Sequence, residues 1–317
     1  MKAIGVDFGG TTVKIGLCVD DQLLDKPGII PTHEHETAEE LIDAISSHAD
    51  SLRAAHPDIT ALGVGVPGFV DFAKGYTHKL TNVHGWDGVP LRDLLAERLG
   101  LIVAVDNDAN CMAYAEWRAG AGQGSTNMLA ITLGTGVGGG LILNGRMHRG
   151  ASSGAGEVGQ MSIHWEGRTG VYNNRGCLEQ YIGHRQITQH AHEIYKAAGI
   201  DRDREECDPA KLAQAAHSGD RVALGVWDDV ARMLACELCN VCWLVSPDTI
   251  VIGGGIAGAE DVLFDPLRKH MQGQLHPVFW ESLRLVPAHF GNEAGIIGAA
   301  RLALDQVDQT PPTAAQG

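Results

Sequence analysis

The sequence predicts an α/β protein of two domains, and three observations support this. The chain has 317 residues, which is more than one hydrophobic core usually holds. Apolar, strand-like runs alternate with amphipathic segments over residues 1–119, as in sheets flanked by helices. Residues 4–17 and 129–143 each contain an apolar strand, a turn of glycine and threonine, and a second strand. Such turns offer N–H groups and hydroxyls to a phosphate chain, so the two hairpins indicate a nucleotide-binding fold.

In the first half of the chain the pattern alternates between strand and helix. Short apolar and β-branched runs predict strands, and apolar residues three or four apart predict helices. We expect strands at 3–6, 13–18, 61–66 and 101–105, and helices at 38–56, 91–99 and 109–119. The glycine-rich sequence GAGQGS that follows indicates a domain boundary.

The second half opens with the second hairpin and continues into a glycine-rich loop. We expect helices at 178–198, 209–218 and 221–244, strands at 249–253 and 284–287, and a closing helix. The first of these strands runs into glycines, an arrangement that places a ligand at a strand's carboxyl end. The predicted domains are a small lobe, 1–118, completed by the C-terminal helix 293–307, a large lobe, 119–292, and a flexible tail, 308–317.

The charge and the cysteine pattern disfavour some binding partners and an iron–sulfur site. The chain has 39 acidic and 24 basic residues and a formal net charge of -15, which disfavours nucleic acid and anionic membranes as partners. No secretory signal precedes the first strand, so we expect a cytoplasmic protein with reduced thiols. Cys236, Cys239 and Cys242 are spaced for one broad face of a helix, which favours buried packing over an iron–sulfur site.

The first hairpin turn, DFGGTTVK, carries residues suited to a nucleoside triphosphate. Asp7, at a strand end, can hold a hydrated Mg2+ ion, and Lys14 can add positive charge. The backbone and hydroxyls of residues 10–12 can bond phosphate oxygens. A plain hairpin would also need glycine, but the second turn at 134–136 favours phosphate binding. The sequence contains no Walker-type P-loop motif.

Polar side chains crowd the point where a predicted strand ends and a helix begins, in VDNDAN at 105–110. Asp108 can accept a proton from a substrate hydroxyl that attacks a γ-phosphate, and Asn107 can bond neighbouring hydroxyls. A helix cap formed by Asp106, Asn107 or Asp108 is the alternative interpretation. One cap needs one such residue, and four polar side chains exceed that need, so we favour a functional role.

Two glutamates lie on glycine-flanked segments further along, Glu157 in GAGEVGQ and Glu179 in RGCLE. Carboxylates of this kind commonly accept hydrogen bonds from vicinal hydroxyls of a sugar. On spacing alone, two solvated surface glutamates would be the simpler interpretation. The two residues become informative only together with the motifs around them.

Taken in order, the motifs resemble the ROK family of sugar kinases and repressors, within the actin-like ATPases. The resemblance covers nearly the whole chain through DFGGTTVK, GVPGFVD, NVHGW, VDNDAN, LGTGVGGG, GEVGQ, RGCLE, IVIGGG and GIIGAA. It implies a two-lobed actin-like ATPase fold of the ribonuclease H-like type, with mixed sheets flanked by helices. It also implies Mg2+-assisted, ATP-dependent phosphorylation of a hexose, foremost glucose at its 6-hydroxyl, with ATP and sugar in the cleft between the lobes.

The resemblance assigns roles residue by residue, with Asp108 as the implied general base. The implied sugar contacts are Gly68, Asn82, Asn107, Asp108, Glu157, Gln160 and Glu179. The residues expected to bind ATP are Asp7, Gly9, Gly10, Thr11, Thr12, Lys14, Thr135 and Gly136 at the phosphates, and Gly254 and Gly255 near the adenosine. Asp7 and ATP together would hold the Mg2+ ion.

The chain departs from the family where the family binds a structural zinc ion. The histidine of the usual ExGH motif is Gln160 here, and two cysteines of CxCGxxGC are replaced by Gly170 and Tyr172, which leaves Cys177. One thiolate cannot form a four-coordinate site. We therefore predict no structural zinc, and a loop at 162–177 held by packing and hydrogen bonds. Gln160 is also expected to affect which substituent is tolerated at the sugar's second carbon.

Several alternatives within the family stay open on sequence alone. An N-acetylmannosamine kinase, an N-acetylglucosamine kinase or a fructokinase would use the same ATP-binding residues. A sugar-binding repressor would need a helix-turn-helix ahead of the first strand; the strand expected from residue 3 and the acidic charge disfavour one. Dimers are frequent in the family, so the resemblance is compatible with a homodimer.

Overall fold

The computed structural model describes residues 1–80 and 85–309 and divides into two compact units. The first unit contains residues 1–123, the segment 147–155 and the chain from Asn292 onward. The second contains residues 124–146 and 156–291. The segment 147–155, which lies within the large lobe expected from sequence, packs with the first unit.

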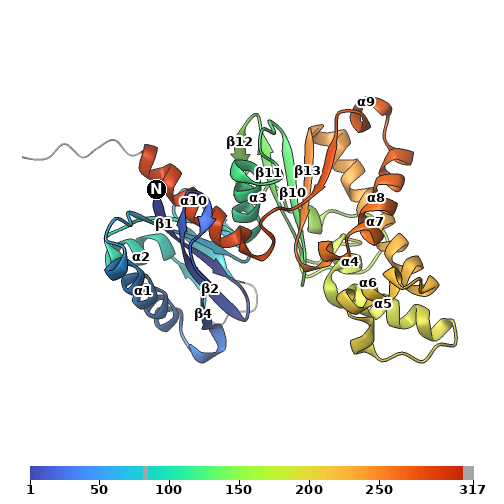
Figure 1. Cartoon of the computed structure of the whole chain (residues 1–317), viewed down its shortest axis with the longest axis horizontal. Helices are drawn as coiled ribbons and strands as arrows, with labels where there is room; N and C mark the ends of the chain where they lie inside the picture. Colours follow the sequence, from blue (N-terminus) through green and yellow to red (C-terminus); the bar gives the residue numbers. More distant parts are fainter. Residues whose placement is uncertain (81–84, 310–317) are drawn as a thin grey trace, which may run out of the picture. The chain divides into compact units, whose positions relative to one another are not determined.

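The central sheet of the first unit has the strand order β3-β2-β1-β5-β9, with β4 paired to β2 (Figure 1). Its strands are β1 (Lys2–Phe8), β2 (Thr12–Val19), β3 (Gln22–Leu23), β4 (Gly28–Pro31), β5 (Ala61–Val66) and β9 (Ile102–Asn107). A second sheet joins β6 (Phe69–Asp71), β7 (Tyr76–Lys79) and β8 (Asp87–Val89). The helices are α1 (Ala38–Ala55), α2 (Leu91–Leu99), α3 (Asp108–Ala119) and α10 (Ala294–Gln309), with short 3-10 turns η1 (Thr32–Glu34) and η5 (Gly291–Glu293).

Helices cover both faces of this central sheet, as Figure 1 shows. Successive strand residues point to opposite faces, and the side chains of Ile4, Val6 and Phe8 pack in one core with Leu41 and Ile45 of α1. The C-terminal helix α10 contacts β1 and β5 and also packs on α3. The end of the chain therefore completes the first unit. The core of this unit joins β1, at the start of the chain, to α10, almost 300 residues later.

Glycines allow α10 to approach the sheet at backbone distance. Gly5 and Gly63 are partners across β1 and β5, and a Cβ at either would overlap a carbonyl oxygen of α10, that of Ile296 or Ala299. The obstacle in both cases is helix backbone, which cannot move aside as a side chain can. These strands need glycine because of this close approach.

Replacing Gly63 with alanine is expected to lower the free energy of unfolding by about 1–3 kcal/mol, because α10 must shift to admit the methyl group. Urea denaturation followed by circular dichroism would measure it. Gly225→Ala is the matched control, since no other part of the described structure lies within 4 Å of a Cβ at this exposed helical glycine; a neutral or slightly stabilising effect is expected there. Equal effects from the two variants would contradict the close-packing argument.

The second unit repeats the sheet plan of the first. Its sheet has the order β12-β11-β10-β13-β14, in which β10 and β11 form an antiparallel hairpin and β13 and β14 add in parallel. In the first unit β1 and β2 form the hairpin and β5 and β9 add in parallel. The second unit's strands are β10 (Met128–Leu133), β11 (Val137–Leu143), β12 (Arg146–His148), β13 (Thr249–Gly253) and β14 (Arg284–Pro287). The two glycine–threonine hairpins thus occupy equivalent places in two sheets of the same topology.

Helices make up most of the rest of the second unit. They are α4 (Glu179–Ile182), α5 (His184–Ala197), α6 (Pro209–His217), α7 (Arg221–Val245), α8 (Asp261–Gln274) and α9 (Pro277–Trp280), with 3-10 turns η2 (Val158–Gln160), η3 (Arg204–Cys207) and η4 (Gly255–Ala259). The sequence predicted one helix at 178–198, but the backbone becomes extended at Gly183 and separates α4 from α5. Cys239 and Cys242 are buried free thiols on α7, as the helical interpretation of their spacing predicted, whereas Cys236 of the same predicted face is only half-buried.

One ionisable group lies inside the apolar core of the second unit. Glu237 of α7 is completely buried, and neither carboxylate oxygen has a hydrogen-bond partner among the described residues. Burial raises the pKa of Glu237 to about 7. In the unfolded chain this carboxyl would titrate near 4.5, so the folded state binds its proton more tightly.

Stability contributed by protonated Glu237 should therefore be complete below about pH 4.5 and lost as the pH rises towards 7. The loss amounts to about 3 kcal/mol for a shift of this size. Glu237→Gln should remove this part of the pH dependence, measured by urea denaturation at pH 5, 6, 7 and 8. Glu205→Gln, at an exposed position, should follow the wild-type curve. An unchanged slope in the Glu237 variant would contradict the assignment.

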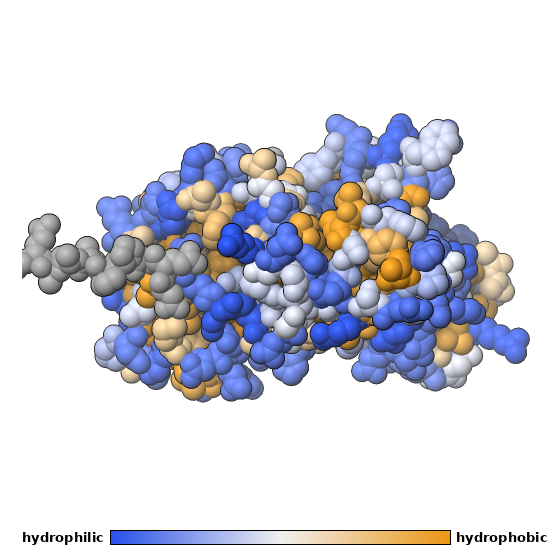
Figure 2. Space-filling model, turned by 90° about the horizontal axis from the view of Figure 1, so that it is seen from above, coloured by the Kyte–Doolittle hydropathy of each residue, from blue (hydrophilic) through white to orange (hydrophobic). Residues whose placement is uncertain are grey.

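The surface is predominantly hydrophilic on the face drawn in Figure 2, where hydrophobic residues form small groups between larger polar areas. A few large apolar side chains are exposed, among them Trp165, Trp243 and Leu244. Within the described part of the chain, every helix is too short or too polar to cross a membrane.

Candidate active site

The first glycine–threonine turn joins β1 to β2 and is braced from one side. The N–H of Gly9 donates to the carbonyl of Thr12 at 2.9 Å and closes the turn. Thr32 of η1 donates its hydroxyl to the Gly10 carbonyl and its N–H to the Thr11 carbonyl, both at 3.0 Å. Thr11 is exposed. No sequence motif links Thr32, some twenty residues away, to this turn.

Asp7 lies at the end of β1 beside the same turn. Lys14 is its partner across the hairpin, with Nζ 3.8 Å from the Asp7 Oδ2. Burial raises the pKa of Asp7 and the Lys14 charge opposes this. A Cβ at Gly295, in the first turn of α10, would lie 2.9 Å from the Asp7 Oδ1. Glycine at this position lets the backbone of α10 pass close to the Asp7 side chain.

Three carboxylates of the first unit, those of Asp7, Asp106 and Asp108, lie at one edge of its sheet. Asp7, Gly65 and Asp106 are in register across the parallel strands β1, β5 and β9. A Cβ at Gly65 would lie 3.4 Å from the Cα of Asp108, so α3 begins directly over this small residue. Burial, with the charges of Asp106, Asp108 and Asp7, raises the pKa of the Cys111 thiol, which shows that all three carboxylates lie near it.

Asn107 is the N-cap of α3. Its Oδ1 accepts hydrogen bonds from the N–H groups of Ala109 at 2.9 Å and Asn110 at 3.2 Å. Its Nδ2 donates to the carbonyl of Gly68 at 3.1 Å. Gly68 has φ of 95°, a conformation that favours glycine. Of the three residues that the sequence offered as the helix cap, Asn107 is the one that caps α3. One N–H of its amide remains available to a ligand.

Asp108 and Asp106, two residues apart, have different surroundings. Asp108 is half-buried in the first turn of α3, and its Oδ1 accepts from the N–H of Ala109 at 2.8 Å. Asp106 is only 2% exposed, and its Oδ1 accepts from the Asn107 N–H at 2.8 Å and the Asn110 Nδ2 at 3.0 Å. Asp106 is thus a structural residue, whereas Asp108 is accessible at the sheet edge.

Arg149 forms an ion pair with the buried Asp106 and donates two hydrogen bonds to the same carboxylate oxygen. Its Nε and Nη2 lie 2.8 Å and 2.6 Å from the Asp106 Oδ2. Its guanidinium also stacks on Phe72, 3.5 Å from the ring centroid. The pair explains why the segment 147–155 packs with the first unit. Sequence reasoning missed Arg149, because nothing in the pattern links two residues 43 positions apart.

The second glycine–threonine turn lies between β10 and β11 and is one residue shorter between its paired strand residues than the first. The N–H of Gly134 donates to the Gly136 carbonyl at 3.0 Å, and Thr135 is exposed. Gly254 lies beside this turn with φ of 85°, and a Cβ there would overlap the backbone of Leu133. Gly255 follows at the start of η4. The residues expected at the phosphates and near the adenosine are therefore close together in the second unit.

Glu179 links this turn to the predicted sugar-binding residues. Its Oε2 accepts from the N–H of Val137 at 2.9 Å, and its Oε1 accepts from the Gln160 Nε2 at 3.2 Å. A Cβ at Gly136 would overlap the same carboxylate. Both oxygens of Glu179 are thus oriented by the protein, and each keeps a lone pair for a hydroxyl.

Glu157 is the second carboxylate of this cluster. Burial raises its pKa, and the nearby charge of Glu179 adds to the increase. Burial followed by the charges of Glu157 and Glu179 also raises the pKa of Tyr172, so the phenol lies near both. Two close carboxylates suit hydroxyl groups, which can donate hydrogen bonds to each.

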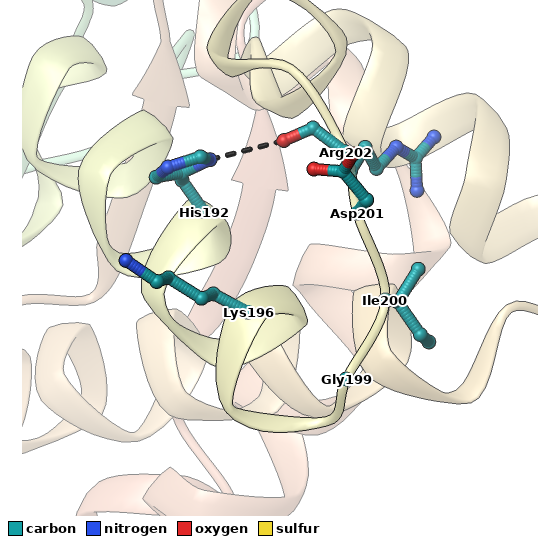
Figure 3. Close-up of a pocket in the computed structure, with 6 residues that line it drawn as sticks. All are labelled: His192, Lys196, Gly199, Ile200, Asp201 and Arg202. Carbon is teal, nitrogen blue, oxygen red and sulfur yellow. Dashed lines mark hydrogen bonds between the residues drawn. The ribbon is translucent and has the colours of Figure 1, made fainter.

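A pocket of about 350 Å³ opens at the C-terminal end of α5 and contains none of the predicted site residues (Figure 3). His192 points across it and bonds the Arg202 carbonyl through Nδ1 at 3.0 Å, whereas the Arg202 guanidinium points away. The start of α5 is tied to the second turn by the bond from the His184 N–H to the Gly134 carbonyl. A helix of 14 residues is about 20 Å long, so this pocket is separate from the cluster at that turn.

Each unit therefore gathers its predicted residues at one edge of its own sheet. The first unit brings together Asp7, Gly9, Gly10, Thr11, Thr12 and Lys14 at the hairpin, and Gly68, Asn107 and Asp108 at the start of α3. The second brings together Thr135, Gly136, Glu157, Gln160, Glu179, Gly254 and Gly255. Asn82 lies outside the described residues.

Comparisons with known proteins show similarity over nearly the whole chain. The family model described as "ROK family" matches residues 3–306. A glucokinase of Halalkalibacterium halodurans is 35% identical over an alignment of 318 positions, which covers 96% of this chain and 95% of that protein. A ROK family glucokinase from Streptomyces griseus, solved in complex with glucose and AMPPNP, is 32% identical with a TM-score of 0.82, covering 96% of this chain and 100% of that one. A ROK hexokinase from Thermus thermophilus is 31% identical with a TM-score of 0.81, covering 98% and 100%.

Proposed function

The chain belongs to the ROK family, and from this premise we propose that it is an ATP-dependent glucokinase that phosphorylates the 6-hydroxyl of glucose. The observation that carries the proposal is the full-length likeness to glucokinases, one of them solved with glucose and AMPPNP. The residues that such a reaction needs are present in both units, at the edges where the glycine–threonine turns lie.

Asp108 is the proposed general base. Phosphoryl transfer needs a group that accepts the proton of the attacking hydroxyl, and Asp108 is an accessible carboxylate at the sheet edge next to Asp7. Asp106 cannot take this role, because Arg149 holds it in a buried ion pair. Asn107 fixes the start of α3 and so sets the direction in which the Asp108 side chain leaves the helix.

Glucose hydroxyls are proposed to bind to the amide and carboxylate groups of the predicted sugar contacts. Glu157 and Glu179 suit a pair of vicinal hydroxyls, and Glu179 is already oriented by Gln160. In the first unit the remaining N–H of Asn107 is available beside the Gly68 carbonyl. Gln160 offers an amide where the family has an imidazole, and this is the position proposed to tune tolerance at the sugar's second carbon.

The phosphates of ATP are proposed to bind at the two turns, 9–12 and 134–136. Lys14 adds positive charge there, and Asp7 would hold the Mg2+ ion through water, since carboxylate oxygens are ligands that Mg2+ prefers. The ion would neutralise phosphate charge when bound. The protein's own contribution is a fixed set of N–H groups and hydroxyls, whose placement costs no reorganisation during the reaction.

A coupled assay of ADP release with different sugars tests the proposal. Glucose, mannose, fructose, N-acetylglucosamine and N-acetylmannosamine would each be titrated with ATP and Mg2+. We expect the highest kcat/KM for glucose. A higher value for an N-acetylhexosamine or for fructose would assign the chain to one of the other sugar kinases, and no turnover with any of them would contradict a sugar kinase.

A further inference from the structure

The loop at 160–177 does not fit the zinc ion that its family position implies. The four positions carry the amide of Gln160, no side chain at Gly170, the phenol of Tyr172 and the thiol of Cys177. Among the described residues, His, Cys, Asp and Glu form no group of three that could hold a metal. The ordering of this loop must come from other contacts.

Asn174 lies at the centre of the loop and makes those contacts. Its Nδ2 donates to the carbonyl of Gln160 at 3.0 Å and to the Gln160 Oε1 at 3.3 Å. A Cβ at Gly170 would overlap the Asn174 Oδ1 and lie 2.8 Å from the Cys177 Sγ. The amide of Asn174 thus occupies the space that a side chain at position 170 would need, beside Cys177.

The backbone closes around this amide. Gly170 donates its N–H to the Asn174 carbonyl at 2.7 Å, and Asn173 donates to the Gly170 carbonyl at 3.1 Å. Asn173 has φ of 61°, a conformation that asparagine tolerates better than most residues. Residues 169 and 175 pair as an antiparallel bridge. The loop is therefore a small closed turn with the Asn174 side chain directed at Gln160.

The orientation of the Gln160 amide depends on Asn174 and in turn affects Glu179. Because Asn174 donates to its Oε1, the NH2 end of the Gln160 amide faces Glu179, to whose Oε1 it donates at 3.2 Å. The other oxygen of Glu179 accepts from Val137, the residue that follows the second turn. A continuous series of hydrogen bonds thus runs from Asn174 through Gln160 and Glu179 to the turn.

We propose that Asn174 is a positioning residue that orders the 160–177 loop without a metal and, through Gln160, fixes the Glu179 carboxylate for sugar binding. The inference rests on the proposed function in one respect, which is that Glu179 binds the sugar. Asn174 itself does not touch the substrate. The amide of Asn174 determines which end of the Gln160 side chain faces Glu179. The hydrogen-bonding groups of Asn174 therefore matter as well as its volume.

Asn174→Ala is expected to raise the Kd for glucose about tenfold, the loss typical of one well-placed hydrogen bond. The Kd for AMPPNP should change less than about twofold. Isothermal titration would give both values, and amide hydrogen exchange should speed up within 162–177. Asn173→Gly is the matched control, since Asn173 is exposed and glycine accepts its backbone conformation; both Kd values should stay at the wild-type level.

Asn174→Asp separates the amide's chemistry from its volume. A carboxylate at this position can only accept, so the Gln160 amide must turn and present its oxygen to Glu179. We expect weaker glucose binding than in Asn174→Ala. Glucose binding at the wild-type level in both variants, or one tightly held zinc per chain in metal analysis of the wild type, would overturn the inference.

The inference and the proposed function fail in different ways. Wild-type protein that binds none of the test sugars contradicts the glucokinase assignment. Hydrogen exchange still decides the role of Asn174 in that case. Unchanged exchange within 162–177 in Asn174→Ala would overturn the loop-ordering role, and faster exchange confined to that loop would support it.

Discussion

Replacing Asp108 with asparagine is expected to lower kcat for glucose phosphorylation at least about a hundredfold, because asparagine cannot accept the proton of the attacking hydroxyl. The backbone N–H of Ala109 can still donate to the amide oxygen that replaces the Asp108 Oδ1, so the fold should be kept. The Kd for glucose should change less than about threefold. Coupled turnover assays and isothermal titration would measure these quantities.

Asp265→Asn serves as the control for this experiment. Asp265 is an exposed residue on α8 that pairs with Arg268 at the surface, and such pairs contribute little to stability. This variant should keep wild-type turnover. Near-normal kcat in Asp108→Asn would show that another group takes the proton.

Replacing Arg149 with methionine is expected to cost about 3–5 kcal/mol of unfolding free energy, because it leaves a buried carboxylate without its partner. The Asp106 side chain is 2% exposed and accepts both of its Arg149 bonds through Oδ2. Methionine keeps much of the side-chain length and removes only the charge and the donors. Urea denaturation would give the difference in unfolding free energy.

The double variant Asp106→Asn with Arg149→Met sharpens this test. Removing both charges should recover a large part of the loss, since no unpaired charge then stays buried. Arg146→Met is the control, at an exposed arginine three residues earlier, and should be close to neutral. An equal loss in the single and double variants would mean that Arg149 acts through packing on Phe72 and not through Asp106.

The sequence predicted the parts of the fold that depend on local patterns. Helix α2 has the predicted bounds of 91–99, and α7 differs by one residue from the prediction of 221–244. Apolar periodicity and capping determine these elements, and both can be read within one segment. The break at Gly183 could not be read in this way, because the apolar pattern continues from α4 into α5.

The placement of the candidate site residues was predictable where a motif holds them within a few adjacent positions. The two turns and VDNDAN are such motifs, and the structure brings their residues to the sheet edges. The sequence did not predict which residue of VDNDAN is buried in an ion pair, which caps the helix and which stays accessible. It depends on Arg149, which selects Asp106 as the buried partner, and on Gly68, whose carbonyl orients the Asn107 cap. Asn174 was missed for the same reason, since its role exists only when the loop at 160–177 is folded.

The most direct test of the account is 31P NMR of a reaction that contains glucose, ATP, Mg2+ and the wild-type protein. We predict one sugar product, glucose 6-phosphate, formed in a 1:1 ratio with ADP, and its near-complete absence with Asp108→Asn under the same conditions. Release of inorganic phosphate without a sugar phosphate, or phosphorylation at another hydroxyl, would contradict the central claim that this chain transfers the γ-phosphoryl group of ATP to the 6-hydroxyl of glucose.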